Sequence, residues 1–290
     1  MGALNYLAAE PLAHFLGENL EYVDFILVSG DVAETEHQPA FQTAMHFFHG
    51  SFPIPFLRHR PFPNIAAQRP IIFVPGNHDR FSRNIKLRCP SDKKIFESVF
   101  GDAWAIASTS TSLSNGIRVT RFRKPTADLL VCCADLTLRP GAKNPLTWWG
   151  CGEVHNDLLE KLARLTQAEL DNERQTAVVW VVHFPPECTS AKPFTKLKEG
   201  AKLIQRAREC GVSLIFCGHT HEEEHYVDSH GTPPWVIVAG TATARRAQSG
   251  HQIYFVSLEV DGKKIQNAEL VTHRLESGRF EAKGNSVLKC

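Results

Sequence analysis

Four apolar runs in this chain each end in a short cluster of glycine, histidine, aspartate or asparagine. The runs are 22–29, 71–74, 178–183 and 213–217, and none alternates cleanly between apolar and polar residues. A continuous apolar run is typical of a strand that is buried on both faces, as in a parallel sheet. Segments with helical periodicity lie between the runs. The sequence therefore predicts an α/β fold in which strands alternate with helices.

Three segments carry apolar residues at helical spacing and are expected to form helices. They are residues 4–20, 153–170 and 197–210. Pro11 interrupts the first of them, which indicates that this helix is either kinked at the proline or begins there. Further strands are expected at 117–122, 129–134, 235–239 and 252–258.

Residues 1–276 are expected to form a single domain. Residues 277–290 contain a run that is polar and includes glycine, so we expect a flexible tail. Residues 51–70 carry five prolines without helical or strand periodicity, which favours a loop near the site or an interaction loop. The sequence carries no signal for the oligomeric state.

Composition narrows the class of protein. With 43% hydrophobic and 22% charged residues, the chain is an ordinary globular protein, and its net charge of +1 gives no sign of a nucleic-acid partner. The eight cysteines contain no C-x-x-C pair and are too sparse for a disulfide scaffold. No apolar run approaches the ~20 residues of a membrane span. These observations favour a cytoplasmic protein.

The polar clusters all follow the carboxyl end of an apolar run. They are Gly30-Asp31, Gly76-Asn77-His78-Asp79, His183 and Gly218-His219-Thr220-His221. In open α/β sheets, ligands bind at the carboxyl ends of the strands. A carboxylate can bridge two cations, an amide oxygen is a neutral hard ligand, and imidazoles suit zinc, iron or manganese. The sequence therefore predicts a site for transition-metal ions at this edge.

A competing metal-binding pattern overlaps the last cluster. Residues 221–225 read H-E-x-x-H, the zinc-peptidase signature, which requires a helix to bring its two histidines to one face. Here a strand and a glycine precede the pattern, and Asp228 stands where the extended signature needs glycine. We therefore interpret His219 and His221 as the site and Glu222–Glu224 as solvated loop charges.

The motifs GDVAE (30–34), GNHD (76–79), VVHFPP (181–186) and GHTH (218–221), in that order, resemble those of the calcineurin-like metallophosphoesterase family. The resemblance implies a four-layer αββα sandwich with two metal ions at the strand ends, of the manganese, iron or zinc type. It also implies hydrolysis of a small-molecule phosphodiester or phosphomonoester by attack of a metal-bound hydroxide.

The resemblance also implies a set of metal ligands. Asp31 would bridge the two metal ions. Asn77, His183 and His219 would complete one metal site, and His221 would belong to the other.

Catalytic and substrate-binding roles follow from the same resemblance. His78 would be the general acid that protonates the leaving oxygen, and Asp79 would orient the His78 ring and stabilise its cationic form. Arg80, Arg245 and Arg246 are candidates for binding the phosphate of the substrate, with ordinary surface arginines as the alternative.

The chain departs from the family pattern near its beginning. The family opens with a D-x-H motif at the end of a first strand, and no such motif precedes residue 22. The D-x-H at residues 228–230 lies in a polar stretch followed by glycine and prolines, which favours a turn. We therefore expect a fold that lacks its first strand, with N-terminal truncation as the simplest explanation.

The missing motif leaves two functions open. One metal site keeps four ligands, whereas the other keeps only Asp31 and His221, so the chain binds one or two metal ions. The first function is a metal-dependent phosphoesterase. The alternative is a catalytically impaired protein of the same fold that serves as a binding or scaffold module.

Overall fold

The computed structural model describes most of the chain. The described residues are 6–33, 38–51, 62–80, 95–101, 104–106, 111–114, 116–137, 152–170, 175–187, 197–227, 231–243 and 250–290. Arg245, Arg246, the D-x-H at 228–230 and residues 52–61 of the proline-rich loop lie outside them.

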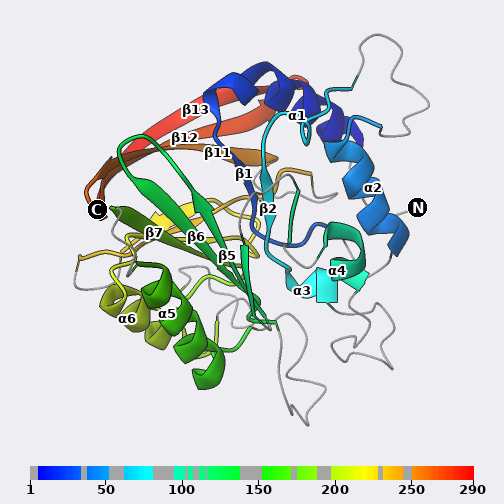
Figure 1. Cartoon of the computed structure of the whole chain (residues 1–290). Coiled ribbons are helices and arrows are strands. Elements are labelled where there is room, and N and C mark those ends of the chain that lie inside the picture. Colours follow the sequence, from blue (N-terminus) through cyan, green and yellow to red (C-terminus); the bar gives the residue numbers. More distant parts are fainter. Residues whose placement is uncertain are drawn as a thin grey trace.

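The strands form three sheets (Figure 1). The first has the order β1-β2-β3, with β1 (Ile26–Val28), β2 (Ile71–Phe73) and β3 (Ala105–Ile106). The second has the order β4-β5-β6-β7-β8-β10-β9, with β4 (Thr111–Ser114), β5 (Ile117–Phe122), β6 (Asp128–Ala134), β7 (Thr176–Val182), β8 (Leu214–Cys217), β9 (Glu224–Tyr226) and β10 (Trp235–Val238). The third is an antiparallel meander of β11 (Gln252–Asp261), β12 (Lys264–Glu276) and β13 (Arg279–Lys289).

Helices pack against each of the three sheets (Figure 1). The longer ones are α1 (Tyr6–Asn19), α2 (Gln38–Phe48), α5 (Asn156–Leu170) and α6 (Gly200–Glu209), and the short ones are η1 (Leu20–Tyr22), α3 (Asn77–Arg80) and α4 (Ile95–Phe100). Phe15 of α1 contacts Phe280 of β13, and Phe48 of α2 contacts Phe73 of β2. Helices α5 and α6 lie together on the seven-stranded sheet (Figure 1).

Strand β7 shows why the apolar runs are continuous. Val179 and Val181 point into the core shared with the first and third sheets, whereas Trp180 and Val182 point into the core beneath α5 and α6. The indole N–H of Trp180 donates to the hydroxyl of Thr166 in α5 at 3.1 Å. Each face of the strand is therefore buried. The layered arrangement confirms the expected αββα sandwich.

Two element boundaries differ from the expectation. Helix α1 begins at Tyr6 and continues through Pro11, so the proline does not start it. The first strand that the structure describes is β1, which covers only residues 26–28 of the apolar run 22–29. Tyr22 belongs to η1, and residues 23–25 lie between the two elements.

The expectation of a flexible tail at 277–290 was wrong. Strand β13 pairs with β12 from Glu276↔Arg279 to Asn267↔Lys289. Phe280 and Leu288 are buried, while most residues between them are exposed. A strand with one solvated face can be mostly polar, and this is why composition alone suggested disorder.

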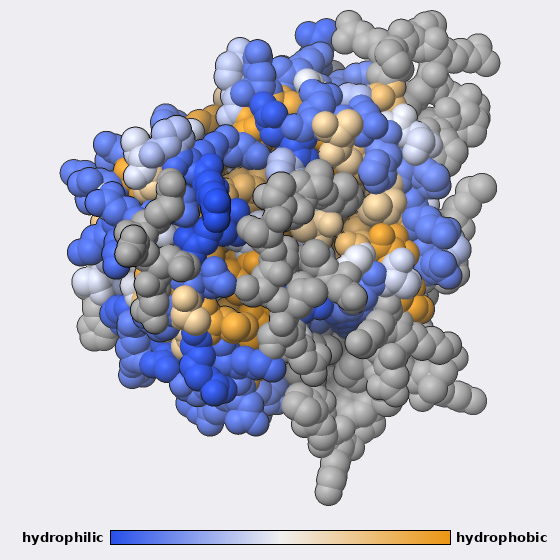
Figure 2. All heavy atoms as spheres, viewed as in Figure 1, coloured by the Kyte–Doolittle hydropathy of each residue, from blue (hydrophilic) through white to orange (hydrophobic). Residues whose placement is uncertain are grey.

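The surface of the described residues is mixed. On the face seen in Figure 2, polar residues cover most of it, and apolar residues appear in separate patches between them. No helix among the described residues is long and apolar enough to cross a membrane.

Candidate metal centre

Four loops bring polar side chains together at the carboxyl ends of β1, β2, β7 and β8. Asp31 follows β1, Asn77 opens α3 after β2, His183 follows β7 directly, and His219 follows β8. Strands β1 and β2 are parallel, and so are β7 and β8. In each pair, the carboxyl ends of both strands therefore lie at the same edge of the sheet. Asp31 and His219 have positive φ angles of 52° and 71°, which turn the chain sharply at the strand ends.

The side chains of these four residues converge on one point. The Oδ1 atom of Asn77 lies 3.0 Å from Nε2 of His183 and 3.0 Å from Nδ1 of His219, and the two nitrogens are 3.2 Å apart. The Oδ2 atom of Asp31 is 3.3 Å from Nε2 of His183. Ligand atoms of Asp31, His183 and His219 all lie within 4.8 Å of one another.

The donor set fits a transition-metal ion. The Nδ1–H of His183 donates to the backbone carbonyl of Ser29 at 2.8 Å, so the neutral ring presents the lone pair of Nε2 to the cluster. A carboxylate, an amide oxygen and two imidazoles are ligands that zinc, iron and manganese accept. Asp31, Asn77, His183 and His219, which the sequence predicted as one metal site, are thus brought together.

The electrostatics of the cluster favour a bound cation. Burial disfavours the charged form of Asp31, but the nearby His183 outweighs it and lowers the pKa of Asp31. Burial also opposes protonation of His183, yet the Asp31 carboxylate raises the pKa of His183. Burial and the charge of His183 lower the pKa of His219 to about 3. At neutral pH Asp31 is therefore a carboxylate and His219 a neutral imidazole, which are the forms that bind metal ions.

Two glycines allow the loops to approach so closely. A Cβ atom at Gly30, whose φ is +106°, would lie 2.2 Å from Nδ1 of His183. A Cβ atom at Gly76 would lie 2.2 Å from Oδ1 of Asp31. Any side chain at either position would therefore push a ligand residue out of place.

Asp79 holds the loops together. Its buried carboxylate accepts hydrogen bonds from the backbone N–H groups of Gly76 at 2.9 Å, Val32 at 3.2 Å and Ala33 at 3.0 Å. Burial and the nearby Asp31 carboxylate raise the pKa of Asp79, against the effect of these donors. The sequence-based expectation was that Asp79 orients the ring of His78, whereas these contacts give it a role in fixing the loops after β1 and β2.

His78 and His221 lie at the rim of the cluster. His78 is exposed, and its backbone N–H donates to Oδ1 of Asp31 at 3.0 Å. His78 and His221 both line the cavity that adjoins the cluster. Among the described residues, the group of close ligand atoms contains Asp31, His183 and His219 but not His221.

The H-E-x-x-H pattern is not helical. Glu224–Tyr226 forms β9, in which His225 pairs with Ile237 of β10. Its two histidines therefore lack the common helical face that the peptidase signature requires.

Arg80, a candidate for binding substrate phosphate, is instead part of a buried ion network. Its Nε donates to Asp135 at 2.8 Å, and its two terminal nitrogens donate to Glu97 at 2.8 and 2.5 Å. The side chain is only 7% exposed. Burial opposes the charge, but the two carboxylates raise the pKa of Arg80. We therefore assign Arg80 to anchoring α3, which carries Asn77 and His78.

Asp135 is a residue that the sequence analysis missed. It directly follows β6, which is parallel to β7, so it repeats the pattern of a polar residue after an apolar run. Its Oδ1 accepts hydrogen bonds from the backbone N–H of Thr137 at 3.0 Å and from the Thr137 hydroxyl. The apolar run 129–134 was the signal that could have identified it.

Together, the layered fold and the four converging side chains define an α/β protein of the αββα sandwich class with a candidate metal site. The sequence matches the calcineurin-like phosphoesterase (Metallophos) family over residues 6–223, and the chain belongs to this family of metal-dependent phosphoesterases. This confirms the resemblance that the four motifs carry. No curated protein sequence matches the chain.

Several solved structures are similar to this chain at low sequence identity. GAP50, described as the anchor in the inner membrane complex of Plasmodium, is 13% identical with a TM-score of 0.57, and the match covers 98% of this chain and 83% of that one. Phosphopantetheinyl hydrolase from Mycobacterium tuberculosis is 14% identical with a TM-score of 0.42, covering 80% and 87%. A putative 5'-nucleotidase from Staphylococcus aureus is 13% identical with a TM-score of 0.45, covering 99% of this chain but 49% of that one.

Proposed function

We propose that this chain hydrolyses a small phosphodiester or phosphomonoester in a metal-dependent reaction. The observation that carries the proposal is the convergence of Asp31, Asn77, His183 and His219 on one point, in a chain of the calcineurin-like phosphoesterase family.

These four residues would hold one metal ion of the manganese, iron or zinc type. A bound ion supplies positive charge for the phosphoryl oxygens and lowers the pKa of a coordinated water. Asp31 and His221 are the candidates for a second ion. The carbonyl of Ser29 keeps the Nε2 lone pair of His183 directed at the cluster.

His78 is the proposed general acid. In the hydrolysis, an oxygen from water forms a bond to phosphorus while the bond from phosphorus to the leaving oxygen breaks. The leaving oxygen then needs a proton, and His78 would deliver it from its position at the rim. The bond from its backbone N–H to Asp31 ties that position to the cluster.

The alternative is a binding or scaffold module with the same fold. It is favoured by one observation: among the described residues, His221 lies outside the group of close ligand atoms, so a second ion has few ligands. The exposed His78 beside the cluster favours the enzyme, because a scaffold needs no acid group there.

A cytoplasmic location is also proposed. The described cysteines Cys132, Cys133, Cys210, Cys217 and Cys290 are free thiols. Such thiols are typical of a reducing compartment.

Hydrolysis of bis(4-nitrophenyl) phosphate with added Mn²⁺ tests the function. We expect turnover that chelation abolishes and that Asp31→Asn reduces to background. Asp157→Asn, the same chemical change at an exposed position in α5, is the matched control and should leave turnover unchanged. Absence of turnover with every divalent metal tried, for a folded and metal-loaded protein, would favour the scaffold.

A further inference from the structure

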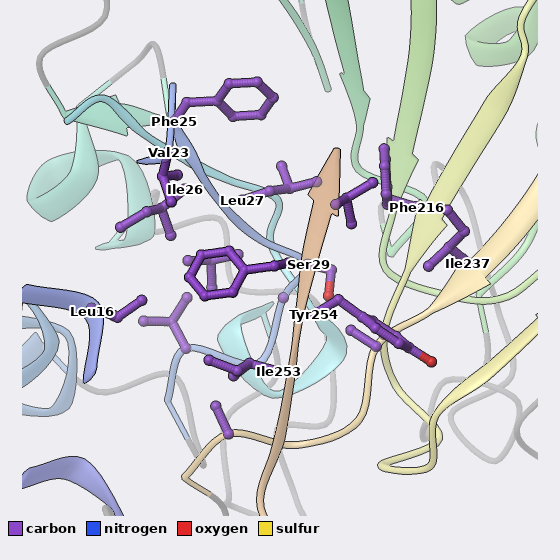
Figure 3. A pocket seen from close by; sticks show the side chains of 18 of the residues that line it. Leu16, Val23, Phe25, Ile26, Leu27, Ser29, Phe216, Ile237, Ile253 and Tyr254 are labelled. Carbon is purple, nitrogen blue, oxygen red and sulfur yellow. The ribbon is translucent and has the colours of Figure 1, made fainter. Parts of the chain in front are cut away.

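His183 and His219 are supported in different ways on the side that faces away from the metal centre. Ser29, just after the end of β1 (Figure 3), accepts the Nδ1–H of His183 at 2.8 Å. In the described part of the chain, Nε2 of His219 makes no such hydrogen bond. A histidine ligand normally donates its other ring N–H to a partner that fixes the orientation of the ring. The ring of His219 therefore depends on another kind of support.

Phe184 supplies packing against this ring. Its side chain is fully buried, and its ring centroid lies 4.7 Å from that of His219 and 4.9 Å from that of His183. The ring planes are inclined by 59° and 74°, which is within the tilted and edge-to-face arrangements that aromatic pairs prefer. Rotation of the His219 ring would bring it against Phe184. The contact therefore favours the orientation in which Nδ1 of His219 faces Asn77.

The Phe184 ring is closely fitted on another side. Gly152 lies against it, and a Cβ atom at this glycine would lie 2.2 Å from Cδ2 of Phe184. Gly152 is itself held by Lys198, whose N–H donates to its carbonyl at 3.0 Å. Interiors packed to this density leave a side chain little room to move. The Phe184 ring therefore occupies a defined position against the two histidines.

Tyr226 fixes the loop that carries Phe184. The Tyr226 hydroxyl accepts from the backbone N–H of Glu187 at 2.9 Å and donates to the backbone carbonyl of the same residue. Pro185 and Pro186 separate Glu187 from Phe184. Because each proline ring fixes its φ angle, the segment between them is stiff. A hydroxyl that holds Glu187 therefore also holds Phe184.

The position of Tyr226 is set by a separate part of the fold. Tyr226 lies in β9, pairs with Val236 of β10 and packs against the core beneath α5 and α6. Its hydroxyl satisfies both backbone groups of Glu187, as a neighbouring strand would do. The end of β9 and the loop after β7 are therefore joined at this point.

We propose that Phe184 is a positioning residue for the ligand His219, and that Tyr226 acts on the same ligand through Phe184. The contacts run from the Tyr226 hydroxyl through the loop after β7 to the imidazole of His219. This inference rests on the metal centre of the proposed function, but it does not require hydrolysis.

Calorimetric titration of the metal-free full chain with Mn²⁺ tests the proposal. Tyr226→Phe removes only the hydroxyl, and we expect the metal affinity to fall ~10–100-fold, the range typical for loss of a partner behind a ligand. Phe184→Leu keeps an apolar side chain but removes the ring, and it should lower the affinity at least as much. The double variant should lose no more affinity than Phe184→Leu alone, because residues that act on one step are not additive.

Two matched variants separate positioning from a structural role. Tyr22→Phe makes the same chemical change at a tyrosine that is 78% exposed, and it should leave the affinity unchanged. Phe41→Leu makes the same change at an equally buried phenylalanine in α2. Urea unfolding of the metal-free proteins should show lower stability for Phe41→Leu and Phe184→Leu, but only Phe184→Leu should bind Mn²⁺ less tightly. If Phe184→Leu does not fold, Tyr226→Phe still tests the proposal because it keeps the packed ring.

Three results would overturn the proposal. Unchanged affinity in Tyr226→Phe or in Phe184→Leu would break the series of contacts. An equal loss of affinity in Phe41→Leu would show that the metal centre responds to any loss of core packing. Multiplied losses in the double variant would show that Tyr226 does not act through Phe184.

The readout of these measurements is metal affinity and not turnover. A wild-type chain that binds Mn²⁺ without hydrolysing a phosphoester would contradict the proposed function alone. Normal affinity in both variants of an active enzyme would contradict this inference alone.

Discussion

His183 and His219 point ring nitrogens at each other across 3.2 Å, and both nitrogens lie 3.0 Å from the amide oxygen of Asn77. The Ser29 carbonyl already takes the Nδ1–H of His183, so a neutral ring has only a lone pair to offer on that side. Two imidazoles so arranged around one oxygen are placed as ligands of a shared cation.

His219→Ala should therefore remove the metal ion. Loss of an outer partner alone typically costs ~10–100-fold in metal affinity, and loss of a ligand should cost more. Elemental analysis after metal loading and gel filtration measures the effect. His225→Ala on β9 is the matched control, and metal loss in that variant with retention in His219→Ala would instead favour the H-E-x-x-H pattern.

His78→Ala should reduce turnover while leaving the metal content unchanged. A general acid contributes ~10²–10⁴-fold, so the decrease should fall in this range. Steady-state hydrolysis and elemental analysis of the same sample measure both quantities. His49→Ala, an exposed histidine after α2, is the control. Equal turnover in the His78 variant would remove this residue from the mechanism.

Gly76→Ala should weaken metal binding although it changes no ligand. The new methyl group would lie 2.2 Å from the Asp31 carboxylate and would displace it. Titration with Mn²⁺, followed by calorimetry, measures the affinity. Gly284→Ala on β13, where a Cβ atom would meet nothing within 4 Å, should bind metal normally. Unchanged affinity in Gly76→Ala would show that a side chain at position 76 does not displace the Asp31 carboxylate.

Arg80→Met should destabilise the fold strongly. Removing one partner of a buried ion pair costs ~3–5 kcal/mol, because it leaves the Asp135 and Glu97 carboxylates buried without their counter-charge. Urea unfolding measures the loss. Arg206→Met breaks the exposed ion pairs with Glu160 and Glu209 and should cost ~0–1 kcal/mol. A raised KM with unchanged stability would instead return Arg80 to the substrate site.

His273→Phe should reduce the sensitivity of stability to acid. The His273 ring packs against Phe15 and Phe255, and burial lowers the pKa of His273 in the folded chain. The unfolded chain therefore binds more protons as the pH falls through ~6.5, and the folded state loses stability on acidification. Phenylalanine removes this loss. Urea unfolding between about pH 7 and about pH 5 should show a flatter profile for the variant, and an identical profile would contradict it.

Much of the fold was predictable because its signals are local in the sequence. Each apolar run and the polar residue after it lie within a few positions of one another, so the strands and the ligands at their ends could be identified together. Strand β13 was missed because only Phe280 and Leu288 near its two ends are buried, and the polar, exposed residues between them show no alternation.

Pairing between distant residues was not predictable. Arg80 resembled a phosphate-binding residue because it follows Asp79, but its partners Glu97 and Asp135 are 17 and 55 positions away. Asp79 looked like a partner for its neighbour His78, whereas its carboxylate accepts from Val32 and Ala33 in another loop.

The sequence by itself determined the α/β class and the residues that meet at the metal centre, because periodicity and strand-end placement act over short stretches of chain. The αββα sandwich was implied by the resemblance of its motifs to the family. Only the tertiary structure decided which carboxylates neutralise Arg80 and which backbone groups bind the carboxylate of Asp79. Those features depend on how distant segments pack, and packing is set by the whole chain at once.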